Sequence, residues 1–167
     1  PGVARTGYGV LKRGDPYPVP LTFGCIETGS DSRPSRRLLE IYERVSLLFD
    51  EYVPDSVVLE QLFFSKNITS AMHVSEARGV ILLAAEERDI SITEYTPNQV
   101  KQAVTGSGRA DKHQVQEMVR RLLDLPGQPS ADAADALACV ICHAHGGLGL
   151  GALSTAGFRV RRGRLVG

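Results

Sequence analysis

The sequence is poor in cysteine, shows no excess of either charge and contains no long apolar run. Its three cysteines do not form a disulfide framework, which favours a reducing compartment such as the cytoplasm. Nineteen basic residues balance nineteen acidic ones, so net charge gives no support to a nucleic-acid-binding domain. No apolar run approaches the length of a membrane span and no signal peptide is recognisable, so we expect no membrane segment.

What the chain does contain is typical of a globular domain. Of its 167 residues, 43% are hydrophobic, enough for one domain with its own core. Apolar patterns predict strands over residues 6–15, 21–29, 56–61 and 90–95, with helices between and after them. This order indicates an α/β domain in which helices flank a mixed sheet. We expect that domain to span residues 1–146, followed by a glycine-rich linker and basic C-terminal tail over 147–167.

Several helix boundaries carry explicit signals. Thr96 comes three residues before Gln99, and Asp111 comes three residues before Gln114, as in capping boxes. Ser130 is the expected N-cap of the last helix. A further helix, predicted from about residue 70 to 88, has apolar and small residues over more than one face. Either it is enclosed within one subunit or, as we expect, it lies in a dimer interface.

Two aspartates stand at the start of the last helix, in the stretch PSADAADALACVICH. Acidic residues in a first helical turn complement the helix dipole, and this structural role is the simplest explanation of Asp132 and Asp135. On a helical wheel, however, they share one side with Cys139 and Cys142. That predicts a buried stripe, on which a carboxylate needs a compensating cation or strong hydrogen bonds.

Glu60 is a third acid in an unusual place, because it ends the apolar run VVL. Either the strand surfaces there, or Glu60 lies at the carboxyl edge of the sheet, where α/β domains bind ligands. We expect Glu60, Asp132 and Asp135 to converge. A hard cation such as Mg²⁺ or Mn²⁺ relieves the repulsion between carboxylates. Two ions about 4 Å apart suit displacement at phosphorus, one activating water and the other stabilising the leaving oxygen.

The stretch CVICH formally matches a c-type haem attachment motif, and its side chains also include zinc-ligand types. It lies inside an apolar helical pattern with no export signal. Two small buried thiols are therefore the better explanation of Cys139 and Cys142.

Four motifs in order give the chain a resemblance to a known family. They are LEQLFFSKN (59–67), EARGV (76–80), QVKQAVTGSGRADKHQV (99–115) and ADAADALA (131–138). Together they resemble the RuvC family of bacterial Holliday junction resolvases, and the resemblance extends over residues 1–146. It implies an RNase H-like fold, a cytoplasmic homodimer, and cleavage of four-way DNA junctions that depends on Mg²⁺, with Mn²⁺ able to substitute and two ions per subunit. It also implies a branch-migration motor of the RuvA and RuvB type as a partner.

The resemblance carries three of the family's four catalytic acids onto Glu60, Asp132 and Asp135. The fourth belongs to a DPG motif that ends the first strand, and the sequence opens with its last two residues, Pro1 and Gly2. We therefore expect that acid immediately before Pro1. The same comparison predicts an apolar central strand that the 167 residues do not contain.

Two lysines, Lys101 and Lys112, match the family's functional lysines, although most lysines are solvated surface charges. A lysine beside the scissile phosphate stabilises developing negative charge. Phe63 matches an aromatic residue that contacts bases near the crossover; the alternative is a core phenylalanine, a role we expect for Phe64.

Further phosphate contacts are expected from position and charge alone. They are Lys66, Arg78 and Arg109, with Lys112 also facing the DNA.

The function we predict is a structure-selective endonuclease that resolves Holliday junctions by paired symmetric nicks, made by a two-fold dimer. The resemblance implies attack of metal-activated water on the phosphodiester, leaving 5′-phosphate and 3′-hydroxyl ends. The alternative is a junction-binding protein without cleavage activity, since the first catalytic Asp is absent from the 167 residues. A third possibility is an RNase H-like hydrolase that cuts another nucleic acid.

Overall fold

The computed structural model describes residues 2–14, 18–62, 68–145, 159–161 and 164–166. In chain order its elements are β1 (Arg5–Lys12), β2 (Val19–Glu27), α1 (Pro34–Tyr52), β3 (Ser56–Glu60), α2 (Ile68–Glu86), β4 (Ser91–Tyr95), α3 (Pro97–Thr105), α4 (Lys112–Leu122), α5 (Ala131–Ala144), β5 (Arg159–Arg161) and β6 (Arg164–Val166). The predicted α/β order is confirmed for β1 to α5. The linker predicted from residue 147 lies mostly outside the described residues, and β5 and β6 are short strands that the sequence patterns did not predict.

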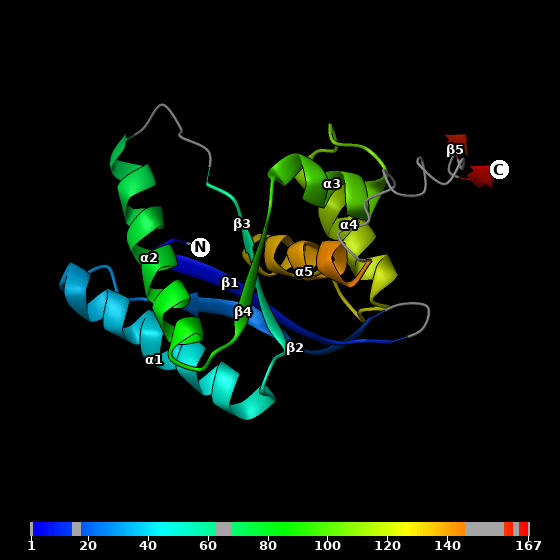
Figure 1. Cartoon of the computed structure of the whole chain (residues 1–167). Coiled ribbons are helices and arrows are strands. Elements are labelled where there is room, and N and C mark those ends of the chain that lie inside the picture. Colours follow the sequence, from blue (N-terminus) through cyan, green and yellow to red (C-terminus); the bar gives the residue numbers. More distant parts are fainter. Residues whose placement is uncertain (1, 15–17, 63–67, 146–158, 162–163, 167) are drawn as a thin grey trace.

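Helices cover the strands from two sides. In Figure 1, α1 and α2 lie to one side of β1 to β4, and α3, α4 and α5 lie to the other. Each group has its own buried cluster, one built around Ile41 and Ile81 and the other around Val119, Leu137 and Ile141. No helix in the described part of the chain is long and apolar enough to cross a membrane.

The strands of the predicted mixed sheet form separate pairs. β1 pairs with β2 in antiparallel fashion and β3 pairs with β4 in parallel, while β5 and β6 pair only with each other. Among the described residues no strand joins β1 to β3. Each of these two strands therefore keeps one unpaired edge. The open edge of β1 is the position at which the sequence predicts a further central strand.

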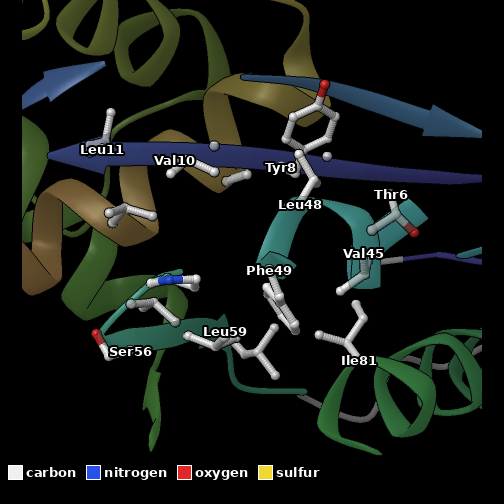
Figure 2. Close-up of a pocket in the computed structure, with 17 residues that line it drawn as sticks. Thr6, Tyr8, Val10, Leu11, Val45, Leu48, Phe49, Ser56, Leu59 and Ile81 are labelled. Carbon is white, nitrogen blue, oxygen red and sulfur yellow. The ribbon is translucent and has the colours of Figure 1, made fainter. Parts of the chain in front are cut away.

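A cavity of about 150 Å³ lies between β1 and β3. Figure 2 shows that Val10 of β1, Phe49 of α1, Leu59 of β3 and Ile81 of α2 are among the side chains around it. Ala136, from α5, also lines it. The lining is largely apolar and comes from β1, β3 and three helices, so the cavity lies beside the open edges of both strands.

The predicted helix starts are confirmed in atomic detail. The Thr96 hydroxyl accepts a hydrogen bond from the backbone N–H of Gln99 at 3.2 Å, and the Gln99 side chain accepts one from the N–H of Thr96 at 2.8 Å. Asp111 and Gln114 repeat this capping box at 2.8 and 2.9 Å. Ser130 caps α5. These caps fix where α3, α4 and α5 begin, and each helix carries a predicted site residue in its first two turns.

One side chain ties α5 to the β3–β4 pair. His143 lies 3.0 Å from the hydroxyl of Ser56 through Nε2 and 3.0 Å from the hydroxyl of Tyr95 through Nδ1. Ser56 begins β3 and Tyr95 ends β4, so the two contacts anchor the last turn of α5 to both strands.

Candidate active site

Glu60 is the last residue of β3, directly beside the end of β4. Its register partner is Tyr95, and its carbonyl oxygen accepts a hydrogen bond from Nη1 of Arg78 at 3.4 Å. The residue is half-buried. Burial, and after it the negative charge of Asp135, raises the pKa of the Glu60 carboxyl group. Glu60 and Asp135, far apart in sequence, are thus close enough for one charge to act on the other.

The first turn of α5 is packed tightly onto β1. A Cβ atom added to Gly7 would lie 1.9 Å from the carbonyl oxygen of Asp132, so only glycine permits this approach. The Ser130 hydroxyl accepts the hydrogen bond of the Ala133 N–H at 3.3 Å and holds the start of the helix. Asp132 and Asp135 therefore project from a helix end whose position is fixed by β1.

Asp135 lies among charges of both signs. Desolvation by the surrounding protein raises the pKa of its carboxyl group, although the residue as a whole is exposed. The positive charges of Lys112 and Lys101 oppose this shift, whereas the charge of Asp132 adds to it. The same two lysines also oppose the rise in the pKa of Glu60. Lys101, from α3, and Lys112, from the first turn of α4, thus lie near two of the three predicted acids.

The expectation of a buried acidic stripe on α5 is wrong in one respect. Cys139 and Cys142 are 7% and 1% exposed, but Asp132 is half-buried and Asp135 is exposed. The first turn of α5 reaches the surface while its later turns are enclosed by α3 and α4. The two acids therefore stand at the solvent end of the stripe.

Asp132 faces a cation of the protein itself. Its Oδ2 accepts a hydrogen bond from Nε of Arg5 at 2.7 Å, and Arg5 also pairs with Glu27 at 3.2 Å. Over the residues that the structure describes, no three His, Cys, Asp or Glu side chains are grouped closely enough to hold a metal ion. The three predicted acids thus share one region without forming a closed ligand set.

The donor chemistry of this region nevertheless fits a hard divalent cation. Neither Glu60 nor Asp135 makes a side-chain hydrogen bond or ion pair with another described residue. Carboxylates that repel each other and keep their oxygens free are what Mg²⁺ or Mn²⁺ binds. Glu60 and Asp135, with Asp132 beside them, are the residues that would hold such an ion.

The predicted DNA contacts differ in their surroundings. Arg109 is exposed and lines a second, polar cavity with His113 and Arg121, beside α3 and α4. Arg78 has a side chain only 13% exposed, and it pairs with Glu94. That engagement holds the ends of β3 and β4 together, so a phosphate contact by Arg78 requires the pair to open.

Phe63, Phe64 and Lys66 fall outside the described residues, and the roles predicted for them stay predictions.

The two cysteines of CVICH are free and buried, as predicted. Burial, and then the nearby charges of Glu60 and Asp135, raises the pKa of the Cys139 thiol to about 12. A thiol in this state stays protonated at neutral pH and is neither a nucleophile nor a ready metal ligand.

Two residues that shape the site were missed in the sequence. Gly7 and Arg5 lie in a stretch that carries no acidic or motif residue, and their roles depend on contacts with a helix more than 120 positions away. The alternation of β1 gives only one signal, that residues 5 and 7 share a face of the strand.

Comparisons with known proteins agree on one family. A family model described as Crossover junction endodeoxyribonuclease RuvC matches residues 1–143. A protein with that description from Dechloromonas aromatica (strain RCB) is 45% identical over 167 residues, which is 100% of this chain and 93% of the relative. One from Alkaliphilus metalliredigens (strain QYMF) is 52% identical over 149 residues, 88% of this chain and 90% of the relative. Among solved structures, "T. thermophilus RuvC in complex with Holliday junction substrate" matches with a TM-score of 0.81 at 34% identity, covering 86% of this chain and 88% of the other.

Proposed function

The chain belongs to the RuvC family of crossover junction endodeoxyribonucleases, and we propose that Glu60, Asp132 and Asp135 form the centre at which it cuts DNA. It has that family's RNase H-like α/β fold and is an endonuclease that resolves Holliday junctions. The single observation that carries the site is the clustering of Glu60 and Asp135, two carboxyl groups of raised pKa, with Lys101 and Lys112.

Nucleases of this family depend on a divalent metal, and we propose Mg²⁺, with Mn²⁺ able to replace it and two ions per subunit. Such ions, when bound, supply Lewis-acid stabilisation of charge on the phosphoryl and leaving oxygens and a water of lowered pKa. The carboxylates of Glu60, Asp132 and Asp135 would hold the ions. Their repulsion in the free protein is the physical reason that a cation binds there.

The lysines act on the phosphate itself. Lys112 is exposed at the start of α4, where its ammonium group neutralises negative charge that develops on the phosphate. Lys101 is half-buried beside the same carboxyl groups and orients the substrate from α3. The products carry 5′-phosphate and 3′-hydroxyl ends, which a ligase can seal.

The DNA extends from this centre over α3, α4 and the segment that follows β3. Phe63 contacts bases at the crossover, and Lys66 and Arg109 contact phosphates. Arg109 is exposed, which supports its role. Arg78 acts mainly by fixing the ends of β3 and β4, and reaches phosphate only if its pair with Glu94 opens.

The active form that we propose is a homodimer joined through α2. Met72 and Leu83 are 59% and 55% exposed, and Gly79 has nothing within 4 Å of a Cβ position. These residues recur at 7- and 4-residue spacing, so they lie on one face of the helix. A two-fold axis through that face gives two cutting centres for paired nicks. Partners of the RuvA and RuvB type deliver the junction, and the cytoplasm, where the DNA is, is the site of action.

The alternative of a junction-binding protein without cleavage activity is not supported, since the relatives named above are described as endodeoxyribonucleases. A direct test incubates the purified protein with a four-way junction, a linear duplex and an RNA–DNA hybrid, with Mg²⁺, Mn²⁺ or a chelator. We expect paired nicks in the junction alone, and only with metal. Cleavage of the hybrid in preference to the junction would favour a different RNase H-like hydrolase. Tight junction binding without cleavage in either metal would restore the alternative.

A further inference from the structure

Arg5 holds one of the three carboxylates of the proposed centre. Its Nε donates to Oδ2 of Asp132 at 2.7 Å, which is the length of a charge-assisted hydrogen bond. The pKa of Arg5 is raised, first by this hydrogen bond and then by the charge of Asp132. The guanidinium thus occupies a ligand oxygen that the proposed function assigns to a metal.

The pairing is built into the fold. Arg5 is the first residue of β1 and its register partner across the ladder is Glu27, the last residue of β2. Two residues along the same strand face, Gly7 lets the backbone of Asp132 approach β1 closely. The backbones of Arg5 and Asp132 are therefore fixed relative to each other, and only their side chains are free to change partners.

A second partner for Arg5 is already in place. Nη1 of Arg5 lies 3.2 Å from Oε1 of Glu27. If Asp132 turns away, the guanidinium keeps one carboxylate and stays on the surface, where its side chain is 52% exposed. Breaking the Arg5–Asp132 contact therefore leaves no charge buried and unpaired.

We propose that Arg5 is a positioning residue that competes with the divalent cation for the carboxylate of Asp132. Asp132 pairs with Arg5 when no cation competes for its carboxylate, as the 2.7 Å contact shows. When the metal binds, the carboxylate of Asp132 leaves Arg5 and joins those of Glu60 and Asp135. Arg5 then keeps its ion pair with Glu27. This inference rests on the proposed function, because it assumes that these three acids bind the metal.

The expected effect is small and has a definite sign. An exposed ion pair is weak, and a neighbouring positive charge repels a divalent cation only moderately at the protein surface. Replacing Arg5 by alanine or glutamine should therefore tighten the binding of Mn²⁺ by about two- to tenfold. The effect should disappear when Asp132 is replaced by asparagine, because no carboxylate then remains for which Arg5 and the cation compete.

The experiment measures Mn²⁺ binding to the DNA-free, 167-residue chain by electron paramagnetic resonance, at constant ionic strength. Arg121→Ala is the matched control, because Nε of Arg121 also lies 2.7 Å from a carboxylate, that of Glu117, and its side chain is 64% exposed. It removes the same charge from a different place. Circular dichroism checks that each variant is folded, and Arg5→Gln serves if Arg5→Ala is not.

We expect tighter Mn²⁺ binding by Arg5→Ala and Arg5→Gln, no change in Arg121→Ala, and no gain when Arg5→Ala is added to Asp132→Asn. Unchanged or weaker binding in the Arg5 variants would overturn the competition. An equal gain in Mn²⁺ affinity when Arg5→Ala is added to Asp132→Asn would also overturn it. That result would show that Arg5 only repels the cation and does not compete for the Asp132 carboxylate. Asp135→Asn separates the two proposals, because wild-type Mn²⁺ affinity in that variant would contradict the metal centre itself and this inference with it.

Discussion

Gly7 and Asp132 touch so closely that a Cβ atom on Gly7 would lie 1.9 Å from the Asp132 carbonyl oxygen. Because the obstructing atom belongs to the backbone, Gly7→Ala has to push the first turn of α5 away from β1. We expect a loss of about 1–3 kcal/mol in the free energy of unfolding, as for overpacking of a tight contact, and a larger loss of cleavage than of junction binding. Urea unfolding and a junction cleavage assay measure the two effects.

The matched control is Gly127→Ala, since a Cβ atom at Gly127 would meet nothing within 4 Å. Its stability should stay within about 0.5 kcal/mol of the wild type. If Gly7→Ala behaves like this control, the close approach of β1 and α5 does not position the site.

Glu60 should weaken the metal-free protein at neutral pH. Burial and the charge of Asp135 raise its pKa above the ordinary value of 4.5. An acid with a higher pKa in the folded state binds its proton more tightly when folded, so its ionisation destabilises the fold above that pKa. Glu60→Gln should therefore raise the melting temperature near neutral pH in the presence of a chelator. This gain in melting temperature should shrink as the pH falls through the raised pKa of Glu60 towards 4.5.

Differential scanning calorimetry over this pH range provides the measurement, with Glu43→Gln as an exposed control on α1. A Glu60→Gln protein that is less stable than the wild type near neutral pH would show that Glu60 makes a stabilising interaction in the free protein, and would weaken its assignment as a free metal ligand.

The cavity between β1 and β3 should accept an extended apolar segment. Filling about 150 Å³ at roughly 24 cal/mol per Å³ corresponds to roughly 3–4 kcal/mol, before the pairing of two open strand edges is added. We expect a chain that carries a short valine- and isoleucine-rich extension ahead of Pro1 to be more stable in urea by at least that order. A glycine- and serine-rich extension of equal length is the control. Equal stability of the two would mean that no strand enters the cavity.

The exposed face of α2 should be the dimer interface. Leu83→Asp places a charge on that face, where Leu83 is 55% exposed, and should convert the dimer to a monomer because a buried unpaired carboxylate is costly. Leu47→Asp is the control, since Leu47 is 63% exposed on α1. Light scattering at micromolar concentration distinguishes the two. A wild-type monomer, or an unchanged dimer in Leu83→Asp, would contradict this interface.

Local signals predicted most of the fold. The sequence alone identifies the helix caps at Thr96, Asp111 and Ser130, because each cap depends on residues only three positions apart. The pairing partner of each strand is different in kind. It depends on which strands are neighbours in space, and strand periodicity does not encode that.

The site divides in the same way. The placement of Glu60 at a strand end and of Asp135 on α5 followed from sequence position. The pairing of Asp132 with Arg5 did not, since the two residues are 127 positions apart and an exposed arginine gives no pattern. The helical wheel of α5 also overstated the burial of its acids. A wheel shows which side of a helix a residue lies on, but not how far along the helix that side is covered by other elements.

The central claim is that a carboxylate centre performs the cutting while other residues supply the affinity for the junction. It is tested most directly by comparing Asp135→Asn with the wild type for cleavage and binding of the same four-way junction in Mg²⁺, with Asp124→Asn as the control on an exposed turn. We expect Asp135→Asn to lose at least about a hundredfold in cleavage, since it removes a metal ligand, and to bind the junction within about threefold of the wild type, since phosphate contacts elsewhere dominate affinity. Asp135→Asn cleaving at the wild-type rate, or losing binding and cleavage together, would contradict the account.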